Sequence, residues 1–177
     1  MDLTEAIASI EARVEDPTRG LPQELFLFAS QITPMVNVDL LIKDDDGRTL
    51  LSWRDDVYCG SGWHVPGGIV RYKEPMLQRL ERVAQVEIGR PVGYDPRPLA
   101  VNELIIEQKV RGHFISFLHR CTLPRGFAPD NGDLGAGDVG YLRWHAGCPD
   151  DLLRVQELYR AYIDDATGYG VNEEGRQ

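Results

Sequence analysis

Cysteine and continuous hydrophobic sequence are both scarce in this chain of 177 residues. Its three cysteines, Cys59, Cys121 and Cys148, are too few for a disulfide framework and lack the CxxC or CxxH spacing of a zinc site. The N-terminal segment alternates charged with apolar residues, so it has neither the apolar run of a signal peptide nor a membrane span. We therefore expect reduced cysteines, a cytoplasmic location and no membrane partner.

Positive charge is also in deficit. The chain carries 19 Lys and Arg against 28 Asp and Glu, a formal net charge of −9 and a pI of about 4.9. Nucleic acids and anionic membranes require clustered basic residues, so this balance argues against both as partners. A small anionic substrate can still bind to a local group of basic side chains. The length suits one ordinary domain with a hydrophobic core.

Hydrophobic spacing predicts two helices ahead of the main domain, over residues 3–14 and 21–31. The second has a broad apolar face, which would be unfavourable if it were exposed on a monomer. We therefore expect residues 1–32 to form a packing or dimerisation arm and the protein to be a homodimer. Residues 33–168 then form the main domain, and residues 169–177 form a polar tail.

The main domain mixes both kinds of secondary structure. Continuous or alternating apolar residues predict strands, and apolar residues three or four apart predict helices. A loop rich in glycine and proline, at 123–140, is long enough to be functional and is expected to overhang the site. The expected strands are 35–42, 49–53, 99–108, 113–122 and 138–144, and the expected helices start at Met76 and span 150–166.

The stretch 63–89 joins a strand end, a Pro-Gly-Gly turn and a charged amphipathic helix. Its glycines permit a tight turn and close approach of backbone to a ligand. Glu87 points along the core-facing edge near the helix C-terminus, where the macrodipole disfavours negative charge, so a positive group should lie beside it. That group is either a basic side chain, Arg82, Arg90 or another, or a divalent cation bound by Glu87 and a carbonyl of the turn.

Several polar residues interrupt the predicted strands. Asp39 lies within an apolar strand, where a free charge would be costly, so it needs a partner or a ligand. His64 ends a strand and either touches substrate or is simply solvated. Glu103 and Glu107 share one strand face, where they either serve as a base or metal ligand or remain solvated.

The spacing within 68–89 resembles the Nudix box, G-x5-E-x7-R-E-U-x-E-E-x-G-U, in which U is a bulky aliphatic residue. The glutamates that the box expects at two positions are replaced by Val83 and Val86, and two of its bulky residues are replaced by Ala84 and Arg90. A box that keeps only its last glutamate is similar to that of the GDP-mannose mannosyl hydrolase branch. The matching residues are Gly68, Glu74, Arg82, Glu87 and Gly89.

This resemblance, which extends over residues 33–144, implies a Nudix-type α/β/α sandwich with a mixed sheet between helices. It also implies a hydrolase that uses Mg²⁺, or Mn²⁺, and releases sugar and nucleoside diphosphate from a GDP-mannose-like nucleotide sugar. The implied metal ligands are Gly68, Glu87 and Asp138, the last by alignment on the Arg143-Trp144 pair. The catalytic histidine of the family falls on Val139, which cannot accept a proton.

The resemblance, together with the neighbouring residues of this chain, predicts the remaining roles. His145 or Glu103 would replace the missing base, and Arg54 would stabilise the leaving group. Substrate contacts would come from Asp39, His64, His113 and Arg82. Two other functions stay open, a nucleoside-diphosphate pyrophosphohydrolase and a degenerate Nudix module that binds a nucleotide sugar without turnover.

Overall fold

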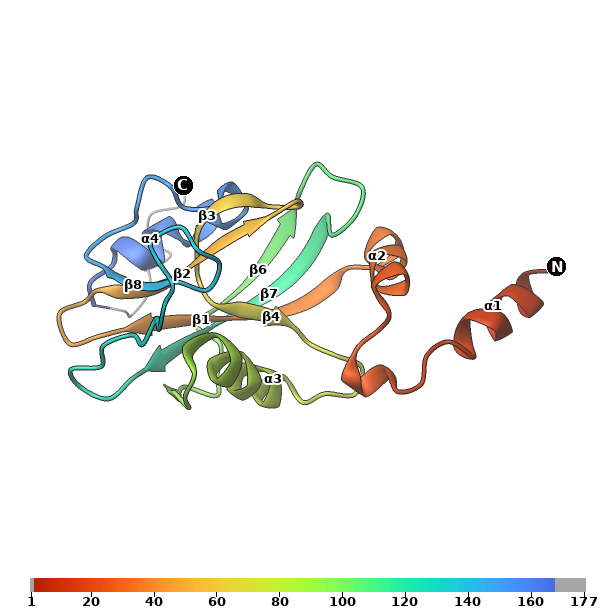
Figure 1. Cartoon of the computed structure of the whole chain (residues 1–177), viewed down its shortest axis with the longest axis horizontal. Coiled ribbons are helices and arrows are strands. Elements are labelled where there is room, and N and C mark those ends of the chain that lie inside the picture. The colour runs from red at the N-terminus through yellow and green to blue at the C-terminus, as the bar shows by residue number, and fades with distance from the viewer. Residues whose placement is uncertain (1, 168–177) are drawn as a thin grey trace.

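The computed structural model describes residues 2–167, and its centre is the parallel pairing of β1 (Met35–Lys43) with β7 (His113–Thr122) (Figure 1). Residues 38–42 of β1 are all buried. A strand buried on both sides needs a covering layer on each face of its sheet, so this continuous buried run already requires helices on both faces.

Six further strands pair in antiparallel fashion around this centre. On one side the order runs from β1 to β2 (Thr49–Asp56) and then β3 (Gly60–His64), with β8 (Leu142–His145) also pairing with β2. The short β4 (Gly67–Ile69) pairs with β1. Both β5 (Gly93–Tyr94) and β6 (Ala100–Ile105) pair with β7, which completes a mixed eight-stranded sheet.

Helical segments cover both faces of the sheet, as the predicted sandwich requires. On one face, α3 (Met76–Val83) continues into the π-helical turn η2 (Ala84–Ile88), and the two pack against β1. The other face is covered by η3 (Arg154–Tyr159) and α4 (Arg160–Asp164), which pack against β1, β2 and β3. The buried helical side chains are Leu80, Val83, Ala84 and Ile88 on the first face and Tyr159 and Ile163 on the second.

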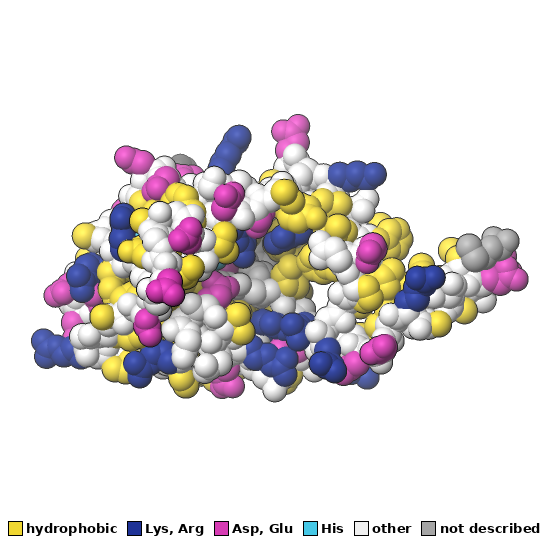
Figure 2. All heavy atoms as spheres, in the orientation of Figure 1, with side chains coloured by type: hydrophobic (Ala, Val, Ile, Leu, Met, Phe, Trp, Pro, Cys, Tyr) yellow, Lys and Arg dark blue, Asp and Glu magenta, His cyan; other side chains and the backbone are white. Residues whose placement is uncertain are grey.

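The N-terminal helices are α1 (Leu3–Glu11) and α2 (Gln23–Ile32), with a short 3-10 turn η1 (Pro17–Arg19) between them. A capping box between Asp2 and Glu5 starts α1, which stands away from the sheet and has no buried residue (Figure 1). Hydrophobic side chains gather over α2 at the base of this arm (Figure 2). No helix within residues 2–167 has the length and apolar character needed to cross a membrane.

The C-terminal helix is shorter than predicted. Residues 151–153 are not helical, because their backbone forms hydrogen bonds with β3. Trp63 N donates to Asp151 O at 2.9 Å, and Leu153 N donates to Trp63 O at 2.8 Å. The helical segment therefore begins at Arg154, as a 3-10 helix. The strand expected to end at Trp53 instead continues to Asp56 and turns back into β3. The predicted polar tail, 169–177, lies outside the described residues.

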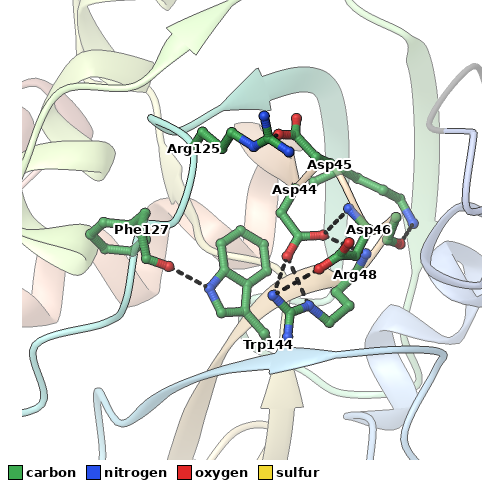
Figure 3. A network of polar contacts seen from close by, with 9 residues as sticks. Asp44, Asp45, Asp46, Arg48, Arg125, Phe127 and Trp144 are labelled. Atoms are coloured by element: carbon green, nitrogen blue, oxygen red, sulfur yellow. Dashed lines mark hydrogen bonds and ion pairs between the residues drawn. The ribbon is translucent and has the colours of Figure 1, made fainter.

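A polar cluster fastens the long loop after β7 to the turn between β1 and β2 (Figure 3). Arg125 pairs with Asp45 at 3.2 Å between Nε and Oδ2. The indole Nε1 of Trp144 donates to the carbonyl of Phe127 at 3.0 Å, and the Arg48 guanidinium lies 5.9 Å from the centre of the same indole ring. The beginning of the loop is thereby held against β8, and none of these residues lines the cavity described below.

Candidate functional site

Asp39 lies in the middle of β1 and is 3% exposed. Its Oδ1 accepts a hydrogen bond from Asn37 Nδ2 at 2.8 Å, and its Oδ2 accepts from the hydroxyls of Ser116 and of Tyr159, the latter at 2.5 Å. Burial raises the pKa of this carboxyl group, and the three hydrogen bonds act in the opposite direction. The partner that the sequence requires for Asp39 is thus supplied by three neutral side chains.

A cavity opens beside Asp39, between β1, β4 and β7 on one side and η3 on the other. It brings together four of the predicted site residues, Asp39, Arg54, His64 and Gly68. The other polar side chains of the lining are Asn37, Cys59, Arg111, Ser116, Gln156 and Tyr159.

Two arginines give this cavity positive charge in an acidic protein. Arg54 is only loosely paired, with 3.6 Å between its Nε and Asp56 Oδ2. Arg111 has a buried Nε without a hydrogen-bond partner, and its guanidinium lies 5.1 Å from the centre of the Tyr58 ring. Two guanidinium groups at the edge of one cavity are suited to phosphate oxygens.

Arg111 was missed by the sequence analysis. It lies between β6 and β7 in the left-handed region, with φ of 54°, a conformation that is uncommon for residues other than glycine. Its backbone N donates to the hydroxyl of Ser30 in α2 at 3.0 Å. The only signal in the sequence is an arginine in a short turn before Gly112, which many surface turns share.

His64, which lines the cavity, faces Glu87, which does not. The Nδ1 of His64 lies 2.8 Å from the carbonyl oxygen of Ser52, and its Nε2 lies 3.5 Å from Glu87 Oε2. The basic side chain that lies beside Glu87 is therefore neither Arg82 nor Arg90 but His64. Gly68 permits α3 to pack closely on β4, because a Cβ there would lie 2.8 Å from Val83 Cγ2.

Glu74, the second residue of the box, stabilises the turn before α3. Its Oε2 accepts from Arg71 N at 3.0 Å and from Arg79 Nε at 2.8 Å, and its Oε1 lies 3.4 Å from Arg82 Nε. Burial raises its pKa, but these hydrogen bonds and charges outweigh burial and lower it overall. Arg82 is thus directed toward Glu74, and it is not part of the cavity lining.

The structure does not bring the other four predicted residues to the cavity lining. Asp138 accepts a hydrogen bond from Gly135 N at 2.8 Å within the long loop. Glu103 and His113 pair with each other across β6 and β7, 3.0 Å apart. His145 packs in the core with its ring centre 4.5 Å from that of Trp63. Within residues 2–167, no three His, Cys, Asp or Glu side chains converge in a way that would hold a metal ion.

His145 should make the fold sensitive to acid. Burial lowers its pKa from 6.5 to about 4, and the Arg143 charge acts in the same direction. The unfolded state therefore binds more protons between these values, so the free energy of unfolding should fall by up to about 3 kcal/mol as pH drops through this window. Urea unfolding at a series of pH values from 7 to 4 measures this change in the free energy of unfolding. His145→Phe should remove this part of the pH dependence, whereas the half-exposed His113→Gln should not. Equal pH slopes in wild type and His145→Phe would contradict the assignment.

Comparisons with known proteins find relatives both in sequence and in structure. No family model matches the chain. Over 115 residues it is 33% identical to the low-salt glycan biosynthesis protein Agl8 of Haloferax volcanii, an alignment that covers 63% of this chain and 73% of that protein.

Among solved structures, a NUDIX family hydrolase from Clostridium perfringens superposes with a TM-score of 0.57 at 15% identity, covering 76% of this chain and 97% of that one. A MutT NUDIX hydrolase from Burkholderia pseudomallei superposes with a TM-score of 0.55 at 22% identity, covering 71% and 95%. At these identities the likeness concerns the fold.

Proposed function

Because this chain belongs to the family of Agl8 and has the Nudix fold, we propose that it is a metal-dependent hydrolase of a nucleoside diphosphate sugar. The observation that carries the proposal is the cavity, where a buried carboxylate, Asp39, lies with two arginines beside the His64–Glu87 pair. Sugar hydroxyls require acceptors such as a carboxylate, and a diphosphate requires cationic donors. The glycan biosynthesis named for the relative is a setting in which nucleotide sugars are used.

The cation of this reaction, Mg²⁺ or Mn²⁺, would be held by Glu87 with a backbone carbonyl of the Gly67-Gly68 turn. Carboxylate and carbonyl oxygens are the ligands that such hard cations prefer. When bound, the cation would neutralise charge on the diphosphate. Asp138, which we predict as a further ligand from the sequence, would have to move from its hydrogen bond with Gly135 to reach it.

Arg54 and Arg111 would bind the diphosphate and stabilise it as the leaving group. Water would attack the anomeric carbon, so that a bond from the water oxygen to this carbon forms. The bond from the carbon to the diphosphate oxygen breaks, and its electron pair leaves with the diphosphate. Neither predicted base, Glu103 or His145, lines the cavity, so we propose the Asp39 carboxylate, whose pKa burial raises, as the proton acceptor.

Hydrolysis in ¹⁸O water tests this function and separates it from its two alternatives. The protein is incubated with Mg²⁺ or Mn²⁺ and a panel of nucleotide sugars, ADP-ribose and dinucleotides, and the label is located by mass spectrometry. We expect label on the released sugar. Label on phosphate would instead identify a pyrophosphohydrolase, and absence of turnover across the metal screen would leave a nucleotide-sugar-binding module.

We also propose that the N-terminal arm, residues 1–32, pairs two copies of the chain. Its apolar side chains are left uncovered, among them Leu3, Ile7, Phe28 and Ile32, each at least 47% exposed. Apolar side chains gathered on one exposed arm favour an interface over a free surface. The GDP-mannose-like specificity that the box resemblance implies is likewise part of this proposal.

A further inference from the structure

We propose that His64 is a nitrogen ligand of the bound cation, so that the site prefers Mn²⁺, Co²⁺ or Zn²⁺ to Mg²⁺. The inference rests on the proposed function only in placing a cation at Glu87. Strand β3 directs Trp63 into the core on the η3 side, and the alternation of side chains along a strand turns His64 the opposite way, toward η2. His64 is 4% exposed, so its ring is fixed in this position.

The hydrogen bond at Nδ1 leaves Nε2 of His64 able to bind a metal. A backbone carbonyl can only accept, so the 2.8 Å contact with Ser52 O places the proton on Nδ1. In the neutral ring, Nε2 then carries a lone pair. Histidine ligands of metals usually donate their second ring N–H to a carbonyl or carboxylate, which fixes the tautomer and the direction of the ring. Ser52 provides this support to His64.

The gap between His64 and Glu87 has the size that a shared metal ion requires. The Nε2 atom is buried without a hydrogen-bond partner, although Glu87 Oε2 lies 3.5 Å away. A hydrogen bond of this type spans about 2.7 to 3.2 Å. Two ligands that each lie about 2.1 Å from one tetrahedrally coordinated ion are separated by about 3.4 Å. A lone pair and a carboxylate at this spacing repel each other unless a cation or a proton lies between them.

A nitrogen ligand is also consistent with the loss of two glutamates from the Nudix box. Val83 and Val86 stand where the Nudix box has glutamates, so this chain offers fewer oxygen ligands near Glu87. Imidazole binds later first-row divalent ions far better than Mg²⁺, which requires oxygen ligands and keeps its waters. A mixed nitrogen and oxygen site would therefore select by metal type, with water and substrate oxygens in the remaining positions.

Cobalt binding tests the proposal without measuring turnover. Full-length protein treated with chelator is titrated with Co²⁺, and the visible d–d absorption is followed, with Mg²⁺ as competitor. His64→Gln should weaken Co²⁺ binding by at least about 100-fold, with little effect on Mg²⁺. His113→Gln, which also removes one imidazole, should leave the Co²⁺ spectrum unchanged.

A second measurement uses the wild-type protein and does not depend on a variant that folds. Its Co²⁺ complex should show a hyperfine-shifted proton resonance that disappears in D₂O, from the Nδ1–H of a coordinated His64. If Co²⁺ binds without this resonance and with equal affinity in His64→Gln, His64 is only an ion-pair partner of Glu87 and the inference is wrong, while the proposed function stands. If Glu87→Gln also keeps full Co²⁺ affinity, the proposed metal position itself is wrong.

Discussion

Glu87→Gln is expected to lower kcat/KM for the nucleotide sugar by about 10³-fold, because loss of the cation forfeits several kcal/mol of charge stabilisation at the diphosphate. Of the two glutamates that the Nudix box places just before its last glycine, only this one remains. Isothermal titration with Mn²⁺ would measure the loss of metal binding, and steady-state kinetics would measure the loss of kcat/KM. The neutral amide keeps the shape of the side chain, so the effect reports on its charge.

The same substitution should leave the fold intact or slightly more stable. A negative charge near the C-terminal end of a helix opposes the macrodipole, so its removal is worth about 0.3 to 1 kcal/mol in favour of folding. Glu81→Gln is the matched control. It removes one negative charge from α3 at an exposed position, where Glu81 accepts a hydrogen bond from Tyr94 OH. Equal loss of Mn²⁺ binding in both variants would show that net charge, and not Glu87, determines metal affinity.

Gly67→Ala is expected to destabilise the fold by about 3 kcal/mol, which corresponds to a fall in Tm of about 6 to 12 °C for a chain of this size. Gly67 pairs with Asp39 across β4 and β1, and a Cβ at this position would overlap Asp39 Oδ1 and lie 2.9 Å from the carbonyl oxygen of Val38. Neither atom can move away, because the carboxylate accepts three hydrogen bonds and Val38 belongs to the central strand.

Thermal and urea unfolding would measure this effect. The control is Gly135→Ala, where the new Cβ would make an ordinary contact of 3.6 Å with Asp138 Oδ2, and a change within about 0.5 kcal/mol is expected. In an Asp39→Ala background, Gly67→Ala should cost less than it does alone, because the overlapping oxygen is gone. Strict additivity of the two changes would contradict a steric conflict between them.

Local sequence patterns predicted the central elements of this fold well. The apolar runs of β1 and β7 and the helical spacing from Met76 each define an element without reference to the rest of the chain. The predicted ends of elements were wrong where backbone from a distant part of the chain competes for the same hydrogen bonds. Residues 151–153 have helical spacing, yet they extend because β3, far away in sequence, offers unpaired groups.

Sequence patterns singled out cavity residues whose environment is local, but not those whose place depends on the tertiary fold. A charge inside an apolar strand identified Asp39 directly. Helical spacing predicts only a core position for Tyr159 and cannot reveal that its hydroxyl reaches Asp39, 120 residues away. Arg111 depends on a left-handed turn and on Ser30, neither of which has a pattern in sequence. The assignment of Asp138 requires an alignment through a loop with five glycines, where no periodicity fixes the register.

The π-helical turn at Ala84–Ile88 sets the direction of the Glu87 side chain, which the sequence of the box alone does not reveal. A π turn closes its hydrogen bonds from residue i to i+5, so it contains one residue more than an α turn. Each residue advances a helix by about 100°. Loss of one residue between Val83 and Glu87 would therefore rotate the carboxylate to another side of the helix, away from His64. The count of residues here, as well as their identity, determines where the charge of Glu87 points.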